Sequence, residues 1–403
     1  MVVTGSEIVE FVDARLAELG SKLREVNRTI HSNPELLFEE HIAHDTICDF
    51  LESLGYKVTR HAYGLETSFE VIYGQGGRMI NINCEYDALP DGGHMCGHNL
   101  IATSSIAAFL GLAAALEKTK VAGRVQLLGT PAEEGGGGKA LLINAGAYKD
   151  VSASLMAHPG GNEKEYQAYA NTRPVAAAHV TYEYKGKPAH AGAYPWDGIN
   201  ALDAFVSLYN NVSLLRQQVK PDERLHCCLV EGPKVANLIP EHTKVDFTVR
   251  SNTLRSLEKL VERVDNCANA AALATGCTME RSSMIPYADH ICPQAMNDQF
   301  IKHLTSHGIK TGNNKTIQAS TDQGNVSHVV PSLHAMFSLE EAGDSNPHQK
   351  PFEKAAGKDK AHNVSITIGK GLAQTAFDLI VDDSLHGQVH KDWKQDIDDR
   401  KDL

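Results

Sequence analysis

The stretch HMCGHN places Cys96 and His98 two positions apart in a loop rich in glycine and histidine. Such a pair could bind a metal ion, carry out redox chemistry, or belong to an ordinary polar loop. Further residues that could bind metal follow along the chain, namely the adjacent acids Glu133 and Glu134 and then His158. Each of these residues alone has a plain interpretation, as a surface acid or a buried histidine. Together they offer the sulfur, nitrogen and oxygen ligands of a metal site.

Short apolar segments that predict β-strands must position these residues. MININC precedes the loop with Cys96 and His98, RVQLLG precedes the glycine-rich loop with the two acids, and ASLMAHPGG contains His158 near its end. Helical segments come between them, and strands that alternate with helices indicate a largely parallel sheet. In such sheets ligands bind beyond the carboxyl ends of the strands. We therefore expect these side chains to meet at one edge of the sheet.

Glu133 and Glu134 should have different roles, because adjacent side chains point in different directions. One of them would bind metal, and the other would take a proton from a water molecule, as hydrolytic metal sites require. Redox chemistry is disfavoured because no second cysteine lies at CxxC spacing from Cys96. A closed structural zinc site would have no need of an adjacent carboxylate in a glycine-rich loop. The pattern favours a catalytic metal site.

The composition is typical of a soluble globular protein with more than one domain. The 403 residues are 42% hydrophobic and 22% charged, with a net charge of −12. This excess of acids argues against a nucleic-acid partner and against an anionic membrane. No apolar run approaches the ~20 residues of a membrane span. Because the eight cysteines are sparse and no signal peptide is recognisable, we expect a cytoplasmic protein.

The pattern of elements changes between residues 173 and 289. The strand-like segments VAAAHVTYEYKG, LHCCLVEG and HTKVDFTVRS alternate there with two helical stretches in the order β-α-β-β-α. The parallel-sheet pattern returns at about residue 290. We therefore predict an α/β fold with two domains. Residues 1–172 and 290–403 would form a discontinuous catalytic domain with a mainly parallel sheet, and residues 173–289 would form an inserted α+β domain.

Eight segments, in order along nearly the whole chain, resemble successive blocks of the aminoacylase/carboxypeptidase-G metallopeptidases, peptidase family M20. The amidohydrolase branch, subfamily D, is the most similar, and Asn99 with the STDQGNVS block resembles its p-aminobenzoyl-glutamate hydrolase and dipeptidase members. The resemblance implies a zinc-peptidase-like catalytic domain, an inserted dimerisation or lid domain, and a homodimer. The segments are RTIHSNPEL, EYDALPDGGHMCGHN, PAEEGGGG, AHPG, GKPAHAGAYPWDGINAL, ANLIPEHTKVDFTVR, STDQGNVSHVVPSLH and NPHQKPFEKAAG.

The resemblance also implies a site with two divalent metal ions per subunit, in which Glu133 is the general base. The wider family has His-x-Asp-x-x-Pro where this chain has EYDALP, so a histidine ligand is absent there and Cys96 would compensate for it. Asp87 would then orient a ligand histidine. Thiolate and imidazole ligands suit Zn²⁺, although mixed sites also accept Mn²⁺, Co²⁺ or Ni²⁺. The implied ligands are Cys96, His98, Glu134, His158 and His348.

The implied reaction is hydrolysis of an amide bond in a dipeptide or an N-acyl-amino acid with a free carboxylate. His190, in GKPAHAG, would reach the active site of the other subunit and help to hold the oxyanion. Asn237 and Arg250 match the family's contacts with the substrate carboxylate, which a guanidinium binds through both oxygens. Two alternatives are an amide-forming acyltransferase or synthase on the same site and a metal-stabilised scaffold without activity. The intact Glu133 argues against the scaffold.

Overall fold

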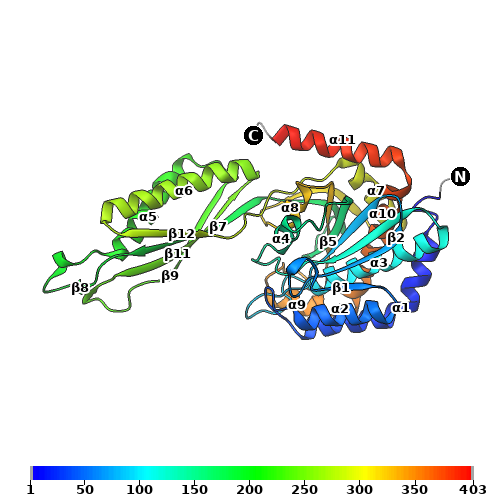
Figure 1. Cartoon of the computed structure of the whole chain (residues 1–403), viewed down its shortest axis with the longest axis horizontal. Helices are drawn as coiled ribbons and strands as arrows, with labels where there is room; N and C mark the ends of the chain where they lie inside the picture. Colours follow the sequence, from blue (N-terminus) through cyan, green and yellow to red (C-terminus); the bar gives the residue numbers. More distant parts are fainter. Residues whose placement is uncertain (1–2, 401–403) are drawn as a thin grey trace. The chain divides into compact units, whose positions relative to one another are not determined.

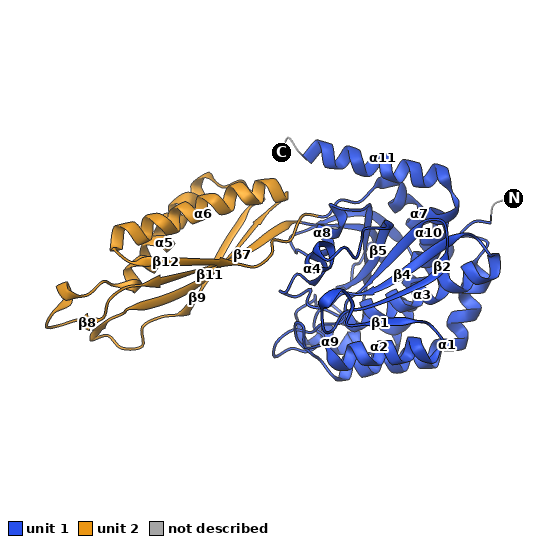
Figure 2. Cartoon of the chain, in the orientation of Figure 1, with its two compact units in different colours: residues 1–174, 290–400 blue, residues 175–289, 401–403 orange. Residues whose placement is uncertain are grey.

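The computed structural model describes residues 3–400, which form two compact units (Figure 2). Unit 2 comprises Val175–Asp289, and unit 1 comprises the described residues on either side of it. The boundaries predicted from the sequence lie within two residues of these. Each unit has its own hydrophobic core.

Unit 1 contains an eight-stranded sheet in the order β1-β2-β4-β3-β5-β14-β6-β13 (Figure 1). The four central strands, β4, β3, β5 and β14, are parallel, and β2 and β6 lie antiparallel to them on either side. This arrangement confirms the predicted α/β fold with a mainly parallel sheet. The strands are β1 (Val58–Arg60), β2 (Phe69–Gln75), β3 (Met79–Cys84), β4 (Gly123–Gly129), β5 (Val151–Gly160), β6 (Ala168–Pro174), β13 (Thr311–Ile317) and β14 (Ser332–Ser338).

The helices of unit 1 pack around this sheet and on one another. In α1 the buried residues recur every three or four positions, so that one face of the helix meets α3 and α10. The helices are α1 (Val9–Ser32), α2 (His41–Ser53), α3 (His98–Thr119), α4 (Gly138–Asn144), α7 (Gln294–Ser306), α8 (Gln323–Ser327), α9 (Lys350–Ala356), α10 (Asp359–Val381) and α11 (Asp383–Arg400).

Helices α3 and α10 are long and apolar enough to cross a membrane by length and composition alone. The expectation that no apolar segment approaches the length of a membrane span was therefore wrong. The most apolar stretch of α3 is 94% buried inside the protein, where the helix contacts α1, α10 and strands β3, β4 and β5. A helix covered by protein on all sides needs no polar face, and this explains its composition.

Unit 2 is built on a four-stranded antiparallel sheet in the order β12-β7-β11-β9, covered by two helices (Figure 2). The predicted order β-α-β-β-α is present, but β12 was missed because its residues are mostly exposed and polar. The short strands β8 and β10 form a separate two-stranded antiparallel sheet. The elements are β7 (Ala176–Lys185), β8 (Ala189–His190), α5 (Ala201–Leu215), β9 (Arg224–Glu231), β10 (Leu238–Ile239), β11 (His242–Ser251), α6 (Leu254–Thr275) and β12 (Thr278–Ser283).

Candidate active site

The predicted metal ligands of unit 1 gather at one edge of its sheet. Because β4, β3, β5 and β14 are parallel neighbours, their carboxyl ends lie at the same edge. Each predicted ligand belongs to one of these ends or to the loop that follows it. Cys96 and His98 follow β3, Glu134 follows β4, His158 lies near the end of β5, and His348 lies in the loop after β14.

These five residues form two clusters that share one thiol. Cys96, His98 and His158 make one cluster, Cys96, Glu134 and His348 make the other, and within each the ligand atoms lie within 4.8 Å of one another. In the first, Cys96 Sγ lies 3.4 Å from His158 Nε2. In the second, Glu134 Oε1 lies 3.8 Å from His348 Nε2. The structure thus brings together all five predicted ligands, and Cys96 belongs to both clusters.

A third cluster combines His98 with two carboxylates, Glu85 and Glu133. The Nε2 atom of His98 lies 3.8 Å from Glu85 Oε2 and 3.8 Å from Glu133 Oε2. Glu133, the predicted general base, therefore lies beside the ligand clusters without being counted in either of them. Glu85 was not among the predicted site residues.

Asp87 contacts both a ligand side chain and the backbone of a second ligand. His98 Nδ1 donates a hydrogen bond to Asp87 Oδ1 over 3.0 Å, and the backbone N–H of Glu134 donates to Asp87 Oδ2 over 2.9 Å. A histidine that donates from Nδ1 presents the lone pair of Nε2 to a metal ion. Asp87 is fully buried, and its role in orienting a ligand histidine stays a prediction.

The glycine-rich loop after β4 has a backbone that few sequences can adopt. Ala132 has a φ of +59°, and its N–H donates to the buried carboxylate of Glu40 over 2.8 Å. A side chain at Gly138 would place its Cβ 1.9 Å from the carbonyl oxygen of Pro131, so only glycine fits there. These constraints fix the backbone on both sides of Glu133 and Glu134.

Burial dominates the acid–base properties of the site. It raises the pKa of Glu133 well above its usual range, with further contributions from Glu85 and Glu134. It also raises the pKa of the Cys96 thiol, and it lowers the pKa of His158 to about 4. The protein alone therefore favours the neutral forms of Glu133, of the Cys96 thiol and of the His158 imidazole, and a divalent cation would reverse this preference for Glu133 and the thiol. For His98 burial acts in the same direction as for His158, but the charges of Cys96 and Asp87 outweigh it and raise the pKa.

The residues present fit divalent metal ions. Among residues 3–400, the buried atoms His98 Nε2 and Glu134 Oε1 have no hydrogen-bond partner. A buried polar atom without a partner costs roughly 1–3 kcal/mol, and cations bound in the two clusters would satisfy these two atoms. Thiolate, imidazole and carboxylate donors together suit a divalent transition-metal ion.

Comparisons with known proteins agree with this chemistry. A model of the peptidase dimerisation domain of family M20 matches residues 172–275. The Xaa-Arg dipeptidase of Mus musculus is 39% identical over 402 residues, which cover 94% of this chain and 90% of that protein. The chain belongs to the M20 peptidase family. It is accordingly a metal-dependent hydrolase of amide bonds, as its sequence predicted.

Further M20 relatives share parts of the sequence or the fold. One of the subunits of the p-aminobenzoyl-glutamate hydrolase of Escherichia coli is 30% identical over 68% of this chain and 60% of its own length. A dinuclear metal binding peptidase of the M20 family from Bacillus subtilis has a similar fold, with a TM-score of 0.64 at 19% identity, over 90% of this chain and 99% of its own. The fold of this M20 enzyme is thus found in a solved structure that binds two metals.

The predicted substrate residues of this M20 enzyme lie in unit 2, at two ends of its sheet. His190 in β8 pairs with Leu238 in β10, next to Asn237. Both short strands adjoin the end of the sheet at which Lys185 of β7 pairs with β11 (Figure 1). Arg250 lies near the other end of β11, eight residue steps, or about 26 Å of strand, from the first residue of β11.

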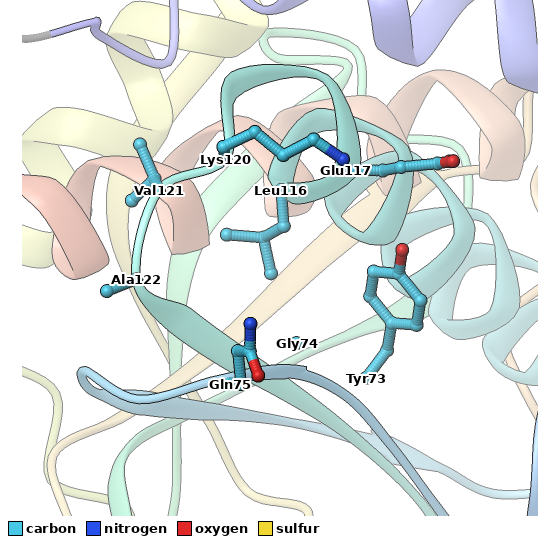
Figure 3. A pocket seen from close by; sticks show the side chains of 8 residues that line it. All are labelled: Tyr73, Gly74, Gln75, Leu116, Glu117, Lys120, Val121 and Ala122. Atoms are coloured by element: carbon cyan, nitrogen blue, oxygen red, sulfur yellow. The ribbon is translucent and has the colours of Figure 1, made fainter.

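A surface pocket elsewhere in unit 1 is unrelated to this site (Figure 3). It lies where β2 ends and where α3 leads into the start of β4, whereas the two acids follow the other end of β4. It offers neither a cysteine nor a histidine. Its lining residues are Tyr73, Gly74, Gln75, Leu116, Glu117, Lys120, Val121 and Ala122.

Proposed function

We propose that this enzyme is a cytoplasmic, dimeric dipeptidase that holds two Zn²⁺ ions and cleaves dipeptides with a free carboxylate and a basic C-terminal residue. The observation that carries the proposal is the pair of ligand clusters that share Cys96, with Glu133 beside them. The name of the mouse relative, an Xaa-Arg dipeptidase, supports the basic residue. All eight cysteines are free thiols, which suits the reducing cytoplasm.

The ligand set supports the choice of metal. Cys96, His98 and His158 would hold one ion, and Cys96, Glu134 and His348 would hold the other. A thiolate shared with imidazole and carboxylate donors is typical of zinc sites. When bound, such ions supply Lewis acidity, which acidifies a water molecule and polarises an amide carbonyl.

Glu133 supplies the proton transfer in the proposed mechanism. Its burial and its acidic neighbours make the carboxylate a better proton acceptor than an exposed glutamate. Glu133 takes a proton from the attacking water and later returns it to the leaving amine, which departs only when protonated. Asp87 keeps His98 oriented through both steps.

His190 is suited to hold the oxyanion that forms on the amide carbonyl. Its Nδ1 accepts hydrogen bonds from the backbone N–H groups of Gly192 and Ala193, over 3.2 and 3.1 Å. A neutral ring that accepts at Nδ1 carries its proton on Nε2, so Nε2 is the donor. A donor placed where charge develops stabilises the transition state.

The two ends of the unit 2 sheet support a site shared between subunits. His190 lies at one end, and Arg250 lies near the other, separated by most of the length of β11. A dipeptide is much shorter than the roughly 26 Å of β11 that separate Arg250 from the end of the sheet next to His190. One substrate could therefore contact both residues only if they came from different chains, as in a two-fold symmetric dimer.

An exposed strand edge offers the surface for this dimer. β9 is an edge strand of the unit 2 sheet, and Leu229 and Val230 on it are 38% and 48% exposed. On α5, which contacts β11 and β7 of the same sheet, Val206 and Tyr209 are exposed as well. An open strand edge with apolar side chains is typical of a pairing surface. We propose that β9 pairs with the same strand of a second copy.

A panel of dipeptides tests the reaction. Purified protein with Zn²⁺ should release free amino acids from dipeptides that end in arginine or lysine, and a chelator should abolish this. The matched controls are the same dipeptides with an amidated C-terminus, which lack the carboxylate, and dipeptides that end in alanine. Accumulation of dipeptides from free amino acids and an activated acyl donor would instead favour a synthase, and metal binding without any turnover would favour a scaffold.

Mixed dimers test the shared site. Glu133→Ala and His190→Ala homodimers should both be nearly inactive. In a mixed dimer, one site loses both residues and the other site keeps both. Random pairing makes half of the dimers mixed, so activity should recover to roughly one quarter of the wild type. If mixed dimers, verified by mass, stay inactive, His190 does not act across the interface.

A further inference from the structure

Lys139 is a buried lysine that the proposed reaction does not use. It is the second residue of α4, directly after the glycine-rich loop, and its side chain has no solvent exposure. Its Nζ lies 2.5 Å from Glu85 Oε1 and 2.5 Å from Asp322 Oδ1. Burial disfavours the charged ammonium, but the carboxylates of Asp322 and Glu85 outweigh this effect and raise the pKa of Lys139. The side chain is thus a permanent cation beneath the site.

The position of Glu85 shows what the buried ammonium group of Lys139 could do next to the metal ligands. Its second oxygen lies 3.8 Å from His98 Nε2, at the same distance as Glu133 Oε2. The three residues could hold a metal ion between them. An ion bound there would take His98 away from the cluster with Cys96, and it would turn Glu133 from a base into a ligand. The site therefore contains a competing position for metal, where binding would stop the reaction.

We propose that Lys139 is a positioning residue that keeps divalent cations out of the Glu85–His98–Glu133 cluster. Its ammonium engages one oxygen of Glu85 and neutralises the charge of that carboxylate. It also repels a second cation in a poorly screened environment. Incoming cations are thereby directed to the clusters that share Cys96. The proposal rests on the proposed function only for the role given to Glu133, since the distribution of metal can be measured without substrate.

The alternative is that Lys139 has a purely structural role. Its backbone N–H donates to Asp322 Oδ2 over 2.9 Å, and its ammonium pairs with the other oxygen of Asp322, at the start of α8. These contacts tie the glycine-rich loop to α8. The two roles differ in the carboxylate that matters, which is Glu85 for metal exclusion and Asp322 for the structural tie.

Cobalt binding separates the two roles. Co²⁺ is added to the metal-free protein, and the thiolate-to-cobalt charge-transfer absorption reports an ion bound to Cys96. In the wild type, the first equivalent of Co²⁺ should give this band. In Lys139→Met, the first equivalent should bind in the cluster without a thiol, and the band should fall at least tenfold. The double variant Glu85→Gln/Lys139→Met should restore the band, whereas Asp322→Asn/Lys139→Met should not.

Each other outcome overturns the proposal. A normal band in Lys139→Met, or its restoration by the Asp322 variant instead of the Glu85 variant, would assign Lys139 a structural role. If Lys139→Met does not fold, judged by circular dichroism, Glu85→Gln and Glu85→Gln/Lys139→Met are compared instead. Their bands should agree within twofold, and a tenfold difference would contradict the proposal. A wild type that cleaves no dipeptide would refute the proposed function and leave the cobalt result intact.

Discussion

Replacing Glu40 by glutamine should stabilise the protein at alkaline pH and change it little near pH 5. Glu40 is completely buried at the start of α2. Its carboxylate accepts hydrogen bonds from the backbone N–H of Ala132, over 2.8 Å, and from the Thr67 hydroxyl, over 2.6 Å. Burial raises the pKa of Glu40 to about 7; the bond from Thr67 lowers it in part, and the nearby charge of Asp87 raises it further.

The magnitude follows from this pKa. An unfolded glutamate has a pKa of 4.5, so between pH 4.5 and about 7 the folded protein holds a proton that the unfolded chain has released. The free energy of unfolding therefore falls as the pH rises through this window, by roughly 3 kcal/mol in all. Glutamine does not titrate, and its amide can accept from Ala132 and donate to the Thr67 oxygen. The advantage of Glu40→Gln should grow by roughly 2–3 kcal/mol between pH 5 and pH 8.

Urea denaturation of both proteins at pH 5 and pH 8, at one fixed metal concentration, measures this difference. Other titrating groups affect the wild type and the variant alike, so they cancel in the comparison. The matched control is Glu39→Gln, which removes the same charge from an exposed neighbour and should show no such pH dependence. If the wild type is as stable as Glu40→Gln at pH 8, the ionised carboxylate is stabilised by its two hydrogen bonds and our reasoning about burial is wrong.

The remaining predictions concern the metal site. Glu133→Gln should keep its metal and lose roughly 10²–10⁴-fold in kcat, whereas Glu134→Ala should lose metal; the reverse result, by elemental analysis and kinetics, would exchange the two roles. Cys96→Ser should bind metal more weakly, because a hydroxyl is a poorer anionic ligand than a thiolate, and unchanged stoichiometry after dialysis would show that the thiol is no ligand. Asp87→Asn should lower metal affinity roughly 10–100-fold by disturbing His98, and chelator competition would detect this.

Most of the metal ligands could be predicted because they follow strands of one parallel sheet. Cys96 lies in the loop after β3 and His98 at its end, Glu134 lies in the loop after β4, and His158 lies near the end of β5; the alternation of strands and helices brings these strand ends together. His348 could not be found in this way. It is one of twenty histidines and lies between β14 and α9 in a segment with no periodic pattern, and only the family resemblance pointed to it.

The charged residues beneath the site could not be predicted from the sequence. Lys139 follows four glycines and resembles an ordinary solvated lysine, and Glu85 precedes an aromatic residue in a loop. The burial of Lys139 as an ion pair depends on Asp322, which is 183 residues away in the sequence and contacts Lys139 only in the folded chain. Hydrophobic periodicity reports which side chains are buried, but it carries no information about which charges are buried as pairs.

The position of Glu133 is therefore a property of the tertiary structure more than of its motif. Three buried carboxylates, from three other parts of unit 1, each accept a hydrogen bond from a backbone N–H of the loop around Glu133 or of the start of α4 directly after it. Because glycine leaves the backbone unusually free, a loop with four consecutive glycines would alone be too flexible to hold a base in place. A carboxylate acceptor makes a stronger bond to an N–H group than a neutral oxygen does. The pairs are Glu40 with Ala132, Asp87 with Glu134, and Asp322 with Lys139.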